Sequence, residues 1–126
     1  MVIQPTSSTR HRVAELARFV QEHDGEFVSM SAFARRSGIS KFALSRAFTA
    51  IMQTSFRRYV IERRVSRAKG LLEDRQYSVT EVAQMTGFGD LPRFDKVFKR
   101  TVGIPPSEYR AEMQRRAKSG GGATNY

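Results

Sequence analysis

The chain has 126 residues, no cysteine and a formal net charge of +10 at pH 7. This length fits one domain or two very small ones and leaves no room for an enzyme with a regulatory module. The lack of cysteine excludes disulfide bonds and thiol catalysis, and no apolar run is long enough to span a membrane. Residues 29–60 hold six basic and no acidic side chains, which predicts a polyanionic partner.

The N-terminal part predicts a short arm followed by one helix. Residues 1–9 are polar and are expected to form a flexible arm. An amphipathic helix is predicted over 10–23, ended by the Asp24-Gly25 pair. Its charges are mixed, so we interpret it as a packing helix whose apolar stripe is Val13, Leu16, Ala17 and Val20.

The next segment predicts two helices joined by a glycine turn, which with the first helix make a unit over 10–55. Ser31 is expected to cap the first of the two and Gly38 to end it, and Ser40 to cap the next, over 41–52. Helical spacing gives this second helix an apolar face of Leu44, Ala47, Phe48 and Ile51. Its outer face is Lys41, Phe42, Ser45, Arg46 and Thr49.

Residues 56–75 predict a long connecting helix, because no glycine occurs before Gly70. A helix of about 18 residues is roughly 27 Å long. That length approaches the roughly 34 Å between successive major-groove entries on one face of DNA. The connecting helix is therefore expected to set where a second reading helix lies relative to the first.

Residues 76–117 predict a second unit of the same kind. Ser78 and Glu81 have the spacing of a capping box, with Thr80 as the alternative cap, and Gly87 is expected to end this helix. Asp90 then caps a helix with Pro92 in its first turn. Its inner face is Phe94, Val97 and Phe98, and its outer face is Arg93, Lys96, Lys99 and Arg100. Residues 118–126, with three consecutive glycines, are expected to be a disordered tail.

The two units are an internal duplication with a period of about fifty residues. The spacing over 83–110 closely resembles the C-terminal signature of the AraC/XylS family of bacterial transcription regulators, and F-x-x-Y-V-x-x-x-R-V at 56–65 resembles its connecting helix. The alternative, the core of some other small helical domain, explains the phenylalanines but not the full spacing. The resemblance implies an all-α fold of about seven helices, with two helix-turn-helix subdomains joined by a long central helix. The matching positions are Ala83, Gly87, Phe88, Phe94, Phe98, Lys99, Gly103, Pro106, Tyr109 and Arg110.

The outer faces of the two second helices supply the expected DNA contacts. Arg46 can donate two hydrogen bonds to guanine, and Phe42 can pack on a thymine methyl group. Leu91 and Pro92 cannot hydrogen-bond a base edge through their side chains, so the first unit is expected to supply most base readout and the second to hold the backbone. The predicted base contacts are Phe42, Ser45, Arg46 and Arg93. The predicted backbone contacts are Arg36, Ser40, Lys41, Thr49, Asp90, Lys96 and Lys99.

The sequence thus predicts a sequence-specific double-stranded DNA-binding activator that is not an enzyme and needs no cofactor. The two histidines, His11 and His23, have no converging acid cluster to complete a metal site. Resemblance to small stand-alone members such as MarA and SoxS implies a monomer on DNA, contact with RNA polymerase, no effector domain in this chain, and a place at the bacterial nucleoid in the cytoplasm. Two alternatives stay open: a polymerase or sigma-factor adaptor with weak DNA binding, and a non-specific nucleoid-type DNA binder.

Overall fold

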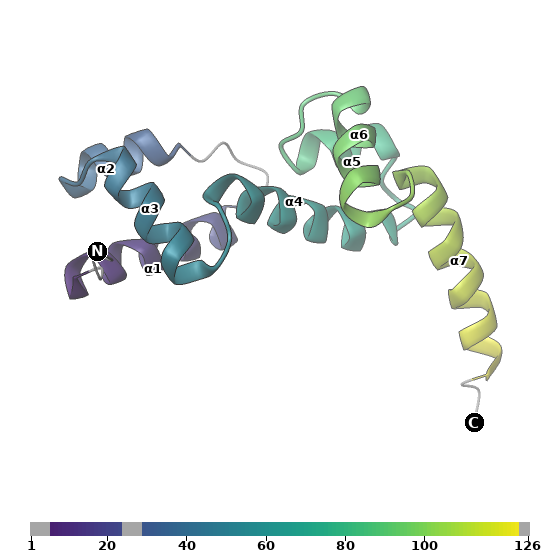
Figure 1. The fold of residues 1–126 in the computed structure, drawn as a ribbon. Coiled ribbons are helices and arrows are strands. Elements are labelled where there is room, and N and C mark those ends of the chain that lie inside the picture. The colour runs from purple at the N-terminus through teal and green to yellow at the C-terminus, as the bar shows by residue number, and fades with distance from the viewer. Residues whose placement is uncertain (1–5, 24–28, 124–126) are drawn as a thin grey trace. The chain divides into compact units, whose positions relative to one another are not determined.

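The computed structural model describes residues 6–23 and 29–123, and these ranges contain helices and no strand (Figure 1). No helix within them is both long and apolar enough to cross a membrane. The seven-helix, all-α architecture predicted from the sequence is confirmed. The helices are α1 (Ser7–Glu22), α2 (Met30–Ser37), α3 (Lys41–Met52), α4 (Phe56–Leu72), α5 (Val79–Met85), α6 (Leu91–Val102) and α7 (Pro106–Ala123).

The chain divides into two compact units within α4, unit 1 over 1–63 and unit 2 over 64–126. The first half of α4 belongs to unit 1, where Phe56 and Tyr59 pack against the core. The second half belongs to unit 2, with Val65, Ala68 and Leu72 buried. The predicted connecting helix is therefore shared between two cores, and it ends at Leu72 instead of residue 75.

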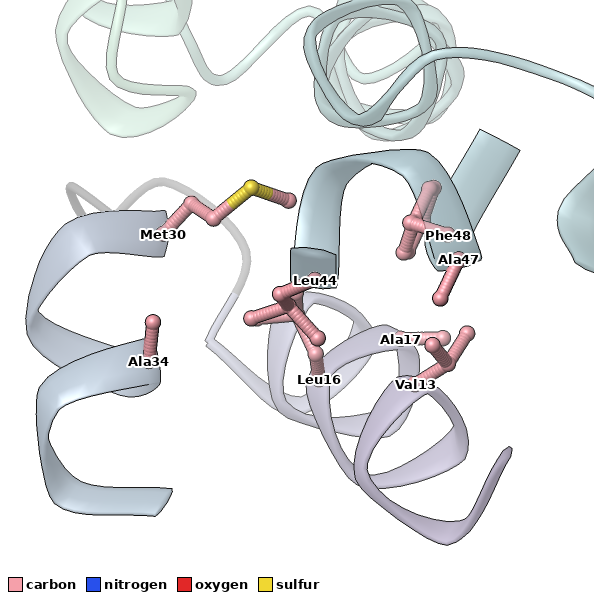
Figure 2. Packing of buried hydrophobic residues seen from close by; sticks show 8 residues of the cluster. All are labelled: Val13, Leu16, Ala17, Met30, Ala34, Leu44, Ala47 and Phe48. Atoms are coloured by element: carbon pink, nitrogen blue, oxygen red, sulfur yellow. The ribbon is translucent and has the colours of Figure 1, made fainter. Parts of the chain in front are cut away.

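The core of unit 1 is built by α1, α2 and α3 (Figure 2). Leu16 of α1 and Leu44 of α3 are fully buried and face each other. Phe48 closes this core through edge-to-face contacts with Phe56 and Tyr59, with ring centroids 5.4 and 5.5 Å apart. Edge-to-face pairs of this kind add to the stabilisation that comes from burial alone. The buried cluster is Val13, Leu16, Ala17, Met30, Ala34, Leu44, Ala47 and Phe48.

The core of unit 2 is a continuous series of aromatic rings. Phe94 lies 5.2 Å from Phe88 and 5.6 Å from Phe98, and Phe98 lies 5.6 Å from Tyr109 of α7. Phe94 and Phe98 are fully buried, which confirms the inner face predicted for this helix. Thr86 is buried as well, and its hydroxyl donates to the carbonyl oxygen of Val82 at 2.7 Å, so the buried hydroxyl is satisfied.

The starts of two helices differ from the sequence prediction. α1 begins at Ser7, because Thr6 caps it by accepting the N–H of Thr9 at 3.1 Å. The predicted arm over 1–9 is thus helical from Ser7, and residues 1–5 lie outside the described residues. α2 is capped by Ser29 rather than Ser31, since this start places Met30 in the core. Ser29 and Ser31 are both suitable capping residues for α2, and the burial of Met30 decides between them.

The C-terminal tail also differs from the prediction. α7 continues to Ala123, so residues 118–123 of the predicted disordered tail are helical, and 124–126 lie outside the described residues. The helix is anchored in unit 2 by buried Pro106 and Tyr109. Glu112 then forms ion pairs with Arg115 and Arg116 one turn on, the spacing that supports a helix once it is nucleated.

The duplication extends further than the aligned motifs. Both turns end in the same bond, from the N–H of Ile39 to Ala34 O at 3.2 Å and from the N–H of Phe88 to Ala83 O at 3.0 Å. Such bonds close the helix end when a left-handed residue follows, and Gly38 (φ +70°) and Gly87 (φ +83°) both lie in that region. The ends of α3 and α6 match too, at left-handed Gln53 and Gly103, and Tyr59 and Tyr109 then occupy equivalent places in α4 and α7.

Candidate nucleic-acid interface

The outer face of α3 carries an exposed aromatic side chain beside an exposed cation. Ser40 caps this helix by accepting the N–H of Ala43 at 3.0 Å, as predicted. Because Leu44 and Phe48 are fully buried on one side, Phe42 is 73% exposed on the other. Arg46 is exposed one turn later on the same face. Among the described residues, Phe42 stands out as the exposed large hydrophobic side chain.

The hydroxyl groups near this face differ in what they can still do. The Thr49 hydroxyl donates to the carbonyl oxygen of Ser45 at 3.1 Å, so its hydrogen is already used within α3. Ser40 uses its oxygen as an acceptor and can still donate its hydrogen. The predicted backbone contacts of Ser40 and Thr49 therefore remain predictions, with Ser40 better placed to donate to a phosphate. Ser45 itself is half-buried.

α6 presents a cationic outer face. Asp90 caps it by accepting the N–H of Arg93 at 2.8 Å, and Pro92 lies in the first turn. An ionised carboxylate has no hydrogen to donate to a phosphate, and the predicted contact of Asp90 with the DNA backbone remains a prediction. Leu91 and Asp95 are half-buried. The exposed cations are Arg93, Lys96, Lys99 and Arg100, and within the described part of the chain none of them forms an ion pair.

Arg64 reaches the turn between α5 and α6, although the sequence predicts no contact for it. Arg64, on the unit 2 half of α4, donates from Nη1 to the carbonyl oxygen of Gly87 at 3.4 Å. Burial lowers the pKa of Arg64, and the nearby charge of Arg93 lowers it further. The signal was present in the sequence, since Arg64 is the arginine of the pattern at 56–65, but periodicity alone does not show which turn it reaches.

Two signature residues of α7 belong to the scaffold of unit 2. The guanidinium group of Arg110 donates to the carbonyl oxygens of Leu72 at 2.8 Å, Asp74 at 3.2 Å and Tyr77. The Leu72 and Asp74 carbonyls lie at or just beyond the end of α4, where intrahelical partners run out, and Tyr77 directly precedes the cap of α5. The hydroxyl of Tyr109 donates to Glu73 at 3.3 Å, and burial followed by the charge of Glu73 raises the pKa of Tyr109. Together these bonds tie α7 to the end of α4.

The histidines serve local roles in α1. His11 lies 3.5 Å from the carboxylate of Glu15, and His23 stacks on Phe19 with its Nδ1 2.9 Å from the Phe19 carbonyl oxygen. In the ranges that the structure describes, no three His, Cys, Asp or Glu side chains gather closely enough to hold a metal ion.

The sequence and the fold are similar to those of known helix-turn-helix proteins. A family profile described as "Helix-turn-helix domain" matches residues 33–112. The chain is 26% identical to the regulatory protein SoxS of Escherichia coli, over 80% of this chain and 94% of SoxS. It is 28% identical to the Msm operon regulatory protein of Streptococcus mutans over 88% of this chain, but spans only 40% of that longer relative.

Two solved structures share the fold. An AraC-type DNA-binding domain protein from Chromobacterium violaceum matches with a TM-score of 0.73 and 25% identity, over 86% of this chain and 96% of that one. The DNA-binding domain of AdpA, solved with a target DNA, matches with a TM-score of 0.77 and 31% identity, over 83% of this chain and 95% of that one. The relatives that match this chain are transcription regulators and not enzymes. The chain belongs to the AraC/XylS family of helix-turn-helix transcription regulators.

Proposed function

We propose that this chain is a sequence-specific double-stranded DNA-binding regulator that inserts α3 and α6 into successive major grooves. The observation that carries the proposal is the exposed pair at the start of α3, Phe42 and Arg46. Leaving 73% of the Phe42 side chain exposed to water is unfavourable, and a partner that covers this side chain removes the cost. Thymine methyl groups and guanine edges in one major groove match the two side chains.

The two units divide the work of recognition. Phe42, Ser45 and Arg46 on α3 carry most of the direct base readout, with Arg36, Ser40, Lys41 and Thr49 near the backbone. On α6, Pro92 removes one N–H and Leu91 offers no polar group, so Lys96 and Lys99 hold phosphates. Arg93 lies between these roles, close enough to the helix start for either a base or a phosphate.

The wider biology follows the family. One chain carries two reading helices, so it binds an asymmetric site as a monomer, and it acts as an activator through contact with RNA polymerase. Support comes from SoxS, which this chain nearly spans, and from the relative named transcriptional activator RhrA of Rhizobium meliloti, 31% identical over 86% of this chain. Regulation of bacterial promoters places the protein at the nucleoid.

Selection from a random duplex pool tests the proposal. Bound sequences are recovered, and affinity for the selected and for a scrambled duplex is measured across a salt series. Specific readout keeps a ratio of about 10³ or more at physiological salt. A non-specific nucleoid-type binder gives a ratio near one with steep salt dependence on both duplexes. An adaptor binds both duplexes weakly and gains affinity only when RNA polymerase is added.

A further inference from the structure

Arg64 and Arg93 lie at the two ends of the turn between α5 and α6. Arg64 reaches this turn from α4 and donates to the carbonyl oxygen of Gly87 at 3.4 Å. Arg93 lies in the first turn of α6, where its N–H is held by the Asp90 cap at 2.8 Å. We propose that Arg64 and Arg93 together bind one phosphate of the DNA backbone. This site rests on the DNA-binding function proposed above.

The local charges favour an anion at this place. Arg64 is partly buried, and burial and then the charge of Arg93 lower the pKa of its guanidinium group. Arg93 also lies at the positive end of the α6 dipole, where anions are stabilised and cations are not. A phosphate bound by both guanidinium groups would offset the repulsion between them and would be stabilised by the α6 dipole.

The duplication shows that the pair is peculiar to unit 2. Ala43 occupies the place of Arg93 in α3, fifty positions earlier, just after the equivalent cap. A small neutral residue is therefore compatible with this turn of the repeat. An arginine there contradicts the local electrostatic preference, and such departures are expected where function requires them. The pair accounts for how a helix that starts with Leu91 and Pro92 can still hold DNA.

The chemistry favours phosphate over guanine for Arg93. A guanine edge offers two neutral acceptors, O6 and N7, which one guanidinium group satisfies. A phosphodiester carries a full negative charge on its unbridged oxygens, so a second guanidinium group gains from it as well. Arg64 is held on the carbonyl oxygen of Gly87, and it brings that second charge to the start of α6.

Neutral linkages in the selected duplex test the site. Single methylphosphonate substitutions are placed along both strands, and each linkage that the wild-type chain contacts loses about tenfold in affinity. We expect Arg64→Gln and Arg93→Gln each to become insensitive at one and the same linkage while keeping the other losses. Arg67→Gln is the matched control, because it removes an exposed arginine from the same helix and should keep the wild-type pattern.

Controls for folding and for base preference complete the test. Thermal melts report whether Arg64→Gln folds; if it does not, Arg64→Lys and Arg93→Lys replace the glutamine variants and must weaken sensitivity at the same linkage. The proposal is overturned if the Arg64 variants keep the wild-type pattern, or if Arg93→Gln changes the preference at one base pair. If the proposed function itself is wrong, the wild-type chain shows no preference for the selected duplex, and this result is distinct from the outcomes above.

Discussion

The two units share one frame and differ in the chemistry of their outer faces. A serine caps α2 and α5, and a left-handed glycine ends each of them. A phenylalanine of α3 or α6 then packs edge-on against a tyrosine of the following helix. On the outside, the second residue of α3 is the exposed Phe42, whereas the second and third residues of α6 are Pro92 and the exposed Arg93. The two copies of the duplication share the residues that close the turn and fill the core, and they differ in the exposed residues of their outer faces.

The interior of the units also differs in one respect that matters for stability. The core of unit 1 is mostly aliphatic, with Phe48 at one end, while unit 2 depends on a series of aromatic rings centred on Phe94 and Phe98. Truncating a side chain in the middle of this series removes ring contacts on both of its sides. Phe48 of unit 1 also contacts two rings, those of Phe56 and Tyr59, so equivalent substitutions should each destabilise the unit that contains them.

The largest effect is expected from truncating the aromatic series. Phe98→Ala should destabilise unit 2 by about 3–5 kcal/mol, because it empties a fully buried site that contacts both Phe94 and Tyr109. Urea unfolding followed by hydrogen exchange resolves the two units. Phe48→Ala is the matched change and should loosen unit 1 while leaving unit 2 protected. Uniform loss of protection in both variants would mean that the units unfold as one.

A smaller effect is expected on base recognition. Arg46→Ala should cost about 1–3 kcal/mol on the selected duplex and much less on a scrambled one. The matched change in unit 2 is Lys96→Ala, at the equivalent place on α6. It should weaken both duplexes by a similar factor, because a phosphate contact carries no sequence information. Affinities by fluorescence anisotropy at one fixed salt concentration compare the two variants, and equal losses for Arg46→Ala on both duplexes would make it a phosphate contact.

The salt dependence provides a third comparison. Replacing Lys96 and Lys99 together by alanine should lower the slope of log affinity against log salt by about 1.8, which corresponds to two lost phosphate contacts. Both lysines are exposed on the face of α6 opposite the buried Phe98, so folding should be unaffected. A slope equal to that of the wild type would show that α6 does not track the backbone.

The smallest effect is expected from removing the serine caps of α2 and α5. Ser78 accepts the N–H of Glu81 at 3.0 Å and Glu81 accepts the N–H of Ser78 at 2.9 Å, whereas in unit 1 the place of Glu81 is taken by Ala32. Ser78→Ala and Ser29→Ala should each cost about 1 kcal/mol. The hydrogen bonds from Ser78 lower the pKa of Glu81 in the folded protein. The stabilisation that Glu81 contributes is therefore present at a pH above its ordinary pKa and is lost as the pH falls through the lowered pKa.

That pH dependence should be confined to unit 2. Acid titration of helical content in the wild type and in Glu81→Gln measures it, because the glutamine keeps an acceptor but has no titrating charge. The variant should show a flatter acid limb than the wild type. An identical acid limb in both proteins would assign the loss to other carboxylates, such as Glu112, whose pKa is lowered by Arg115 and Arg116.

Much of this protein was determined by its sequence alone. The Ser40, Ser78 and Asp90 caps, the glycines that end α2 and α5, and the inner faces of α3 and α6 all follow from local chemistry. Capping and amphipathic spacing act within one or two helical turns, so a linear pattern contains the information they need. The family could be named on the same basis, because its signature records the spacing of those local features.

Only the tertiary structure decided which residues complete the units across long sequence distances. Arg64 contacts the Gly87 carbonyl 23 positions away, and Arg110 reaches the end of α4 across 38. Ser29 rather than Ser31 caps α2 because burial of Met30 sets its start, a choice that capping chemistry leaves open. These outcomes depend on how a half of α4, the α5–α6 turn and α7 pack around one core. No local period encodes that packing, since each contact joins a carbonyl group and a side chain from segments far apart in the sequence.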